Sequence, residues 1–403
     1  SLMKVKDVLK YGDFIGNNPY FIECNSKERI DIDYPEEFNL ATYHYYNNDA
    51  IYGCENKNSL KLNSLYDLNK TSDISKFQNE VEIKIKEKEI KIIDVTIRDG
   101  GFDNNWEWTI NEVEEKLKCA SETGLEYFEI GYLCDEINNN GHFRNISFKT
   151  INGIFNNVKP KCKICLLFDS WRYDTHNLLE KSKTNVDLIR IVTYMEIEKL
   201  LFSVNQCKIV KNKGYKVSLN IMCGSYLSLE SIKKIKDILT ENIYVFDYIY
   251  IADSYGSMEP KDVNMIFSSF KQLKNINQNL KIGFHIHNNC QIGMANMIAS
   301  LEHIDIIDAS YFGMGRGMGN IRLEDVILFL IIKKQYKLNI VPFINYLDKI
   351  CNDVQKKEIK NTLLGFLNIH PYRITNDHTN LLDTFNYLIN LSKNEKYDYK
   401  LNI

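Results

Sequence analysis

The sequence predicts an α/β fold of the (β/α)8 TIM-barrel type, and two features of the chain support this prediction. Between Lys91 and about Tyr336, a β-branched run, a loop and an amphipathic helical stretch alternate eight times. The runs are almost continuously apolar, as in residues 187–192, which is typical of parallel strands covered by helices. Eight such units in about 250 residues match the size of a closed barrel.

The predicted strands follow one another at regular intervals, at residues 92–97, 127–132, 164–169, 186–193, 217–223, 246–252, 282–287 and 304–310. Helices are predicted between them, for example at 109–122, 196–213, 229–240, 261–273 and 290–302. The first of these helices opens with Thr109 and Glu112 in capping-box spacing. A doubly wound open sheet is the alternative, but no Gly-x-Gly-x-x-Gly motif follows the first strand.

Two segments lie outside this repeat. Residues 1–90 form an N-terminal extension of unknown role, which ends in a Lys/Glu alternation from Val81 to Lys91 that predicts an exposed strand or hairpin. Residues 91–336 form the predicted barrel domain. Residues 337–403 form a predicted helical segment, which we expect to pack beside the barrel or over its mouth.

Composition excludes several classes of partner. The formal net charge is -3 and charges of both signs are mixed, so we expect no nucleic-acid partner. No run reaches the roughly 18 apolar residues of a membrane span, so we expect a cytoplasmic protein without membrane contact. The 10 cysteines are scattered, which favours reduced thiols over a disulfide framework.

The strongest chemical signal is His285-Ile-His287 at the end of the seventh predicted strand. Strand side chains alternate, so the two imidazoles share one face and can hold a metal ion together. An isolated pair of this kind also occurs through packing alone. Asp99 follows the first strand, and closure of the barrel places strands one, eight and seven side by side. Asp99 therefore becomes a third candidate ligand.

A glycine-rich loop follows the eighth predicted strand and ends at Asn320. Its glycines, Gly315 and Gly317 among them, let the backbone approach a ligand closely, and Asn320 offers a fourth ligand oxygen. A strained loop without a ligand and a phosphate cradle are the alternatives. A mixed nitrogen and oxygen site suits Mg²⁺, Mn²⁺, Co²⁺ or Zn²⁺ used as a Lewis acid. The absence of cysteine among the ligands argues against a structural zinc.

Three motifs together give the chain a resemblance to the DRE-TIM metallolyase superfamily, which includes 3-hydroxy-3-methylglutaryl-CoA lyase, 4-hydroxy-2-oxovalerate aldolase and the isopropylmalate and homocitrate synthases. The motifs are Asp94-x-Thr-x-Arg98-Asp99-Gly, His285-x-His287-Asn288 and Gly313-x-Gly-x-Gly-x-Gly-Asn320. The resemblance covers the barrel, roughly residues 91–336.

The resemblance implies a role for each motif. Asp99, His285, His287 and Asn320 bind a divalent cation, and Arg98 stabilises the enolate of a 2-oxo acid substrate while a C–C bond forms or breaks. Glu129 occupies the place of an acidic residue that orients Arg98 or metal-bound water, although a plain salt bridge is an equal alternative. Further expected contacts come from the turn with Asp253 and Ser254, which resembles a family turn, and from Asn220 on the fifth strand.

The sequence also departs from family patterns. The aldolases carry a His three residues after the metal-binding Asp, where this chain has Phe102. The lyases have a Cys in the glycine-rich loop, which is absent here, and the related carboxyltransferases use a Lys where this chain has Ala252. A proton donor or base is still required. His370 and Tyr372 are candidates if the C-terminal helices form a lid, and Asp103 in the rim loop is another.

We weigh three functions. The first is a metal-dependent aldolase or lyase acting through a 2-oxo acid enolate. The second is a Claisen-type acyltransferase of the isopropylmalate synthase kind, which normally has a longer C-terminal region. The third is a non-catalytic barrel that acts as a binding module, which would have no need for buried polar ligands. The oligomeric state stays open between a monomer and a homodimer, although barrels of this family commonly pair.

Overall fold

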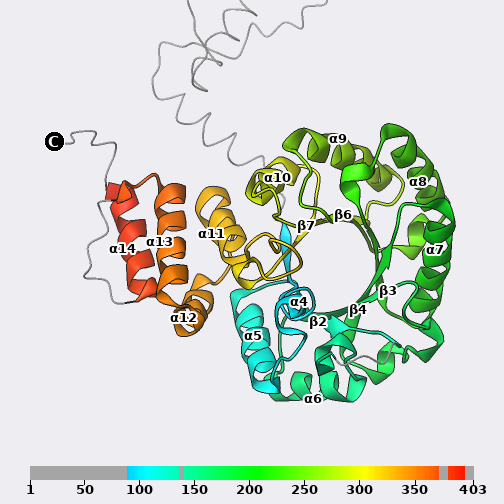
Figure 1. The fold of residues 1–403 in the computed structure, drawn as a ribbon, viewed down its shortest axis with the longest axis horizontal. Coiled ribbons are helices and arrows are strands. Elements are labelled where there is room, and N and C mark those ends of the chain that lie inside the picture. Colours follow the sequence, from blue (N-terminus) through cyan, green and yellow to red (C-terminus); the bar gives the residue numbers. More distant parts are fainter. Residues whose placement is uncertain (1–88, 136–139, 372–379, 395–403) are drawn as a thin grey trace, which may run out of the picture. The chain divides into compact units, whose positions relative to one another are not determined.

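The computed structural model describes residues 89–135, 140–371 and 380–394, and its centre is a closed barrel of eight parallel strands (Figure 1). Each strand pairs with the next along the chain, and β1 closes the ring by pairing with β8. The strands are β1 Lys91–Asp94, β2 Tyr127–Tyr132, β3 Lys163–Asp169, β4 Val186–Thr193, β5 Lys216–Ile221, β6 Tyr248–Asp253, β7 Lys281–Ile286 and β8 Ile306–Ala309. The predicted barrel is confirmed.

Helices form the outer ring of the barrel, as Figure 1 shows. The Thr109 capping box opens the first helix of this ring, because the Thr109 side chain accepts from the Glu112 N–H and the Glu112 carboxylate accepts from the Thr109 N–H at 2.8 Å. The ring consists of α5 Ile110–Thr123, α6 Phe148–Val158, α7 Ile197–Asn212, α8 Leu229–Glu241, α9 Pro260–Lys271, α10 Gly293–Ser300 and α11 Leu323–Lys334, and the short α4 Gly101–Asn104 follows β1.

The inside of the barrel is partly ionic. Its apolar cluster is separate from the large core between strands and helices, and it includes Tyr127, Leu188, Tyr250 and Ile306. Arg190 of β4 lies in the same interior and is fully buried, with its guanidinium carbon 4.4 Å from the Tyr250 ring centroid. A buried arginine needs acidic partners, and those of Arg190 are Glu129 and Asp308, which contact the residues of the functional site.

Two of the strands that end earlier than predicted are followed by residues of the functional site. β1 ends at Asp94 and not at residue 97, because the Asp94 Oδ1 atom accepts from the Thr96 N–H at 2.9 Å and from the Thr96 hydroxyl at 2.5 Å. An aspartate that captures the backbone two residues on produces a turn. Arg98 and Asp99 therefore lie in a loop at the barrel rim. His287 also falls just beyond β7, in a bridge with Asn320.

The C-terminal helices α12 Ile340–Ile350, α13 Asp353–Leu367 and α14 Leu381–Asn394 pack beside the barrel and not over its mouth (Figure 1). Helix α12 contacts α5, and α13 contacts α11. The apolar face of α12 explains this position, since Phe343 is fully buried and stacks on Tyr311 with ring centroids 5.6 Å apart. The predicted helices exist, and those that the structure describes take the position beside the barrel, one of the two expected.

The N-terminal extension predicted for residues 1–90, with its Lys/Glu alternation, lies outside the described residues except at its last two positions. All eight cysteines that the structure describes are free thiols. None of the described helices has the length and apolar character needed to cross a membrane.

Candidate metal centre

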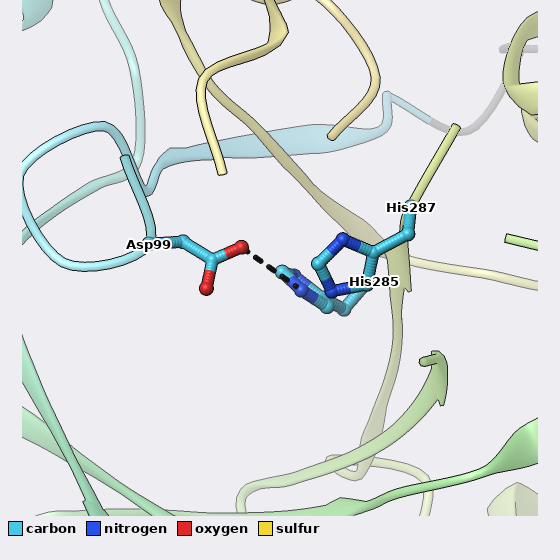
Figure 2. Close-up of side chains that lie close together, drawn as sticks. All are labelled: Asp99, His285 and His287. Carbon is cyan, nitrogen blue, oxygen red and sulfur yellow. Dashed lines mark ion pairs between the residues drawn. The ribbon is translucent and has the colours of Figure 1, made fainter. Parts of the chain in front are cut away.

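Asp99, His285 and His287 lie together at the barrel rim (Figure 2). All three are buried, and one ligand atom from each lies within 4.8 Å of the others. The Asp99 Oδ2 atom is 3.6 Å from the His285 Nε2 atom, which is too long for a hydrogen bond. Ligands at about 2.1 Å from one ion lie roughly 3.0 to 3.4 Å apart at right or tetrahedral angles, so this spacing suits a shared cation.

His285 is held by a carboxylate on the neighbouring strand. Its Nδ1 atom lies 2.9 Å from the Asp308 Oδ2 atom, which leaves Nε2 directed toward Asp99. A carboxylate behind a ligand histidine fixes the ring and its tautomer. Arg190 donates to the same Asp308 oxygen at 2.5 Å. Burial opposes ionisation of Asp308, but Arg190 and His285 hold its pKa below its usual range.

His287 has an unusual environment for a buried imidazole. Neither of its ring nitrogens has a hydrogen-bond partner among the described residues, although both are buried. Burial lowers the pKa of His287 to about 4, with nearby Asp99 opposing the change. The ring is therefore neutral at pH 7, the form that binds a metal ion. Two unpaired buried nitrogens fit a missing cation better than a packing role.

Asn320 lies directly beside the Asp99 carboxylate. Its Nδ2 atom donates to Asp99 Oδ2 at 2.7 Å and to the Met314 carbonyl at 2.8 Å. Its Oδ1 atom is buried without a partner in the described part of the chain. Rotation of the carboxamide exchanges the two atoms, so the side chain can present its oxygen to a cation next to Asp99. The residues present thus fit a divalent metal ion.

Arg98 connects the metal centre to Glu129. Its Nη1 atom donates to Asp99 Oδ1 at 2.5 Å, and its Nε atom donates to Glu129 Oε2 at 2.6 Å. Burial alone would raise the pKa of Asp99, but Arg98 and His285 hold it well below the usual range. Glu129 also accepts from Arg190 at 2.8 Å. Glu129 therefore orients both arginines through one carboxylate.

The glycine-rich loop of residues 313–320 approaches the centre through its backbone. Gly315 has a φ of 151°, and a Cβ atom there would lie 2.5 Å from Asn320 Nδ2 and 3.1 Å from Asp99 Oδ2. Its N–H donates to Asp103 at 3.0 Å, so the Asp103 carboxylate supports the loop. At Gly317, a Cβ atom would meet the Asn289 side chain at 2.7 Å. Glycine is needed here for close approach.

Of the other residues predicted to contact substrate, one lines the cavity at the barrel mouth and two do not. Asn220 lines a cavity at the barrel mouth together with Arg98 and His285. Asp253 instead accepts from the N–H groups of Ser257 and Met258 at 3.1 and 3.2 Å, and so closes its own turn. The Ser254 hydroxyl accepts from the Cys223 N–H at 2.9 Å. The last two side chains bond to loop backbone and are not among those that line the cavity.

His370, one of the predicted proton donors, does not line this cavity. His370 is exposed just after α13, a helix that packs on α11 and α14. The condition for a role of His370, a lid formed by the C-terminal helices, is not met by the described helices. Tyr372 lies outside the described residues.

Sequence reasoning missed several residues of the site. Asp308 acts behind the ligands together with Arg190, and the signal for Asp308 was an ionisable residue inside an otherwise apolar strand. Arg144 and Asp169 line the cavity, and no motif marks either of them. Asp169 ends β3 and Arg144 ends the short 3-10 helix after β2, so their meeting at the mouth depends on the closed barrel and not on a local pattern.

Comparisons with known proteins identify the family of the chain. A model of the HMGL-like family matches residues 89–350. The 4-hydroxy-2-oxovalerate aldolase of Bacillus cereus is 25% identical over 258 residues, which cover 63% of this chain and 73% of that protein. The aldolase of the same name from Geobacillus thermodenitrificans is 27% identical over 248 residues, covering 60% and 70%.

A solved structure shows the same fold. Hydroxymethylglutaryl-CoA lyase from Pseudomonas aeruginosa superposes with a TM-score of 0.52 at 14% identity, and the match covers 75% of this chain and 98% of that one. The family model spans most of the chain and the whole described barrel. This protein therefore belongs to the HMGL-like family, within the DRE-TIM metallolyase superfamily, and is an enzyme of the lyase type found there.

Proposed function

We propose that this protein is a divalent-metal-dependent aldolase that forms or cleaves a C–C bond through the enolate of a 2-oxo acid. One observation supports this most strongly: Arg98, which is bonded to Asp99, and His285 line the same cavity at the barrel mouth. The similarity to proteins named 4-hydroxy-2-oxovalerate aldolase supports a 2-oxo acid as the substrate class.

The proposed ligands are Asp99, His285 and His287, with the Asn320 carboxamide oxygen as a fourth. A divalent cation bound there, Mg²⁺, Mn²⁺, Co²⁺ or Zn²⁺, supplies a fixed positive charge that polarises the substrate carbonyl. Neutral His287 and ionised Asp99 are both in the ligand form at pH 7. The ligand set leaves coordination positions for a substrate, as a catalytic site requires.

Arg98 is proposed to stabilise the enolate oxygen. Burial alone would lower the pKa of its guanidinium, but Asp99 and Glu129 hold it well above the usual range, so the charge is permanent. Two of its nitrogens are engaged, and Nη2 makes no hydrogen bond among the described residues. That nitrogen remains available for a substrate oxygen in the cavity. A donor fixed in advance, where negative charge develops, typically contributes 10²- to 10³-fold in rate.

Proton exchange tests this proposal. Metal-free protein is loaded in turn with each of the four cations and incubated in D2O with pyruvate, 2-oxobutyrate or oxaloacetate, and exchange of the C3 protons is followed by NMR. We expect exchange that depends on the metal and disappears in Asp99→Asn. As a matched control, Asp305→Asn should keep it, because Asp305 lies before β8 and pairs with Lys274 at 2.8 Å.

The same samples separate the alternatives. Release of free CoA from acetyl-CoA in the presence of a 2-oxo acid, without exchange of the 2-oxo acid protons, would instead indicate a Claisen-type acyltransferase. Failure to bind any of the four cations at micromolar concentration would contradict both enzyme functions and favour a binding module.

A further inference from the structure

Arg144 is a buried cation at the barrel mouth that forms no ion pair with a described carboxylate, although its charge opposes the rise in the pKa of Asp169 that burial causes. It ends the short 3-10 helix η1 His142–Arg144 after β2, is 6% exposed and lines the cavity that contains Arg98 and His285. Its guanidinium carbon lies 4.0 Å from the Tyr132 ring centroid and 4.9 Å from that of Trp106. The structure shows no ion pair or hydrogen bond of this guanidinium with any described residue.

Three other arginines line the same cavity, and they differ in whether a carboxylate forms an ion pair with them. Arg98 is bonded to Asp99 and Glu129, and Arg172 is paired with Asp169 at 3.3 Å. Arg316, on the glycine-rich loop, is exposed and lies over the Phe102 ring at 5.3 Å. No described carboxylate forms an ion pair with Arg144 or Arg316. The mouth therefore has an excess of positive charge.

An unpaired buried guanidinium destabilises a fold, because it loses hydration without gaining a hydrogen-bonded anion. Stacking on two aromatic rings offsets only part of that loss. The rings also hold the planar group in place at the wall of the cavity. Such a fixed, desolvated guanidinium is suited to bidentate recognition of a carboxylate or a phosphate.

We infer that Arg144 and Arg316 form an anion subsite that binds a carboxylate or phosphate group on the aldehyde or ketone partner of the reaction. This inference rests on the proposed aldolase function and adds the substrate class. The partner would thus be an anionic carbonyl compound, such as a semialdehyde acid or a phosphorylated aldehyde, and not a small neutral aldehyde.

The position of Arg144 explains why the subsite serves the second substrate. The carboxylate of a 2-oxo acid is adjacent to its carbonyl, so both groups stay at the metal centre and Arg98. Arg144 and Arg98 both lie against the Tyr132 ring, with guanidinium carbons 4.0 and 5.7 Å from its centroid, and Arg144 is bonded to none of the proposed metal ligands. An anion held at Arg144 therefore belongs to the other end of the aldol product.

Acceptor preference tests the subsite. Aldol addition of pyruvate is measured with acetaldehyde, succinic semialdehyde and glyceraldehyde 3-phosphate, and kcat/KM is compared. We expect at least tenfold higher kcat/KM for one or both anionic acceptors, and the better of the two identifies the anion as carboxylate or phosphate. The ratio of anionic to neutral acceptor should fall at least tenfold in Arg144→Met and less in Arg144→Lys.

A surface variant controls for the loss of one charge. Lys234→Met removes an exposed cation that pairs with Glu230 on α8 and should keep the wild-type ratio. Arg144→Met also removes ring stacking, so Arg316→Met, on the exposed loop, is the second test variant and should lower the ratio in the same direction. Circular dichroism melts establish that each variant is folded.

The experiments distinguish a wrong subsite hypothesis from a wrong proposed function. Wild-type protein that exchanges pyruvate protons but shows equal kcat/KM for neutral and anionic acceptors would overturn the subsite alone. Calorimetric titration of succinate and inorganic phosphate gives a readout without turnover. Absence of exchange, with succinate or phosphate binding that weakens at least tenfold in Arg144→Met, would overturn the aldolase proposal and support the subsite.

Discussion

Arg190 and Asp308 form an ion pair of 2.5 Å that is wholly enclosed by the barrel. Arg190 also donates to Glu129, which accepts from Arg98, while Asp308 contacts His285. A continuous ionic chain thus runs inside the barrel from the proposed enolate-stabilising arginine to a proposed metal ligand. Because every link is buried, the chain fixes both groups relative to each other.

Removal of the central cation should destabilise the protein strongly. Arg190→Met leaves Glu129 and Asp308 buried without their shared partner, which we expect to lower the free energy of unfolding by about 3 to 5 kcal/mol. Urea unfolding measures the change. Lys211→Met is the control, because it breaks a partly exposed pair with Asp247 that should contribute at most about 1 kcal/mol. Equal effects of the two substitutions would show that the chain is not structurally important.

Asp308→Asn should weaken metal binding without removing a ligand. The amide cannot hold the His285 ring as the carboxylate does, and loss of such a partner typically lowers metal affinity about 10- to 100-fold. Competition with a chromophoric chelator measures affinity for each cation. Asp305→Asn, the same substitution before β8, should bind metal like the wild type. An unchanged affinity in Asp308→Asn would exclude this role for the carboxylate.

The barrel and the grouping of Asp99, His285 and His287 could both be predicted from the sequence. The barrel follows from the local periodicity of strands and helices, and the grouping follows from closure of the sheet. Alternation along a strand is enough to place His285 and His287 on one face. The position of Arg144 could not be predicted, since it depends on Tyr132 at the end of β2 and Trp106 in the loop after α4 approaching each other. The choice between a position beside the barrel and one over its mouth stayed open for a similar reason: helix periodicity predicts α12 but not that α12 contacts α5.

Asp94 should make stability depend on pH. Burial raises the pKa of Asp94 from 3.8 to about 6, with hydrogen bonds from Thr96 opposing the change. Between these values the folded protein retains a proton that the unfolded chain has lost. Stability should therefore fall by about 3 kcal/mol as the pH rises from 4 to above 6.

Asp94→Asn tests this effect, since asparagine keeps an acceptor for Thr96 but has no charge to lose. Urea unfolding at several pH values should show that the stability of this variant, relative to wild type, increases across the same window. Glu122→Gln, an exposed substitution on α5, should follow the wild-type profile. Parallel profiles for Asp94→Asn and wild type would mean that Asp94 is ionised in the folded protein throughout.

Gly315→Ala should damage the metal centre through a single methyl group. The backbone φ of 151° is strained for any residue with a side chain, and the new Cβ atom would press on Asn320 Nδ2 at 2.5 Å and on Asp99 Oδ2 at 3.1 Å. We expect metal affinity to fall at least tenfold, since displaced ligands lose their geometry.

Gly153→Ala is the matched control, because no atom lies within 4 Å of the added methyl group on the exposed side of α6. That substitution should leave metal affinity unchanged and raise stability by up to about 1 kcal/mol. Wild-type affinity in Gly315→Ala would show that the loop does not support the centre.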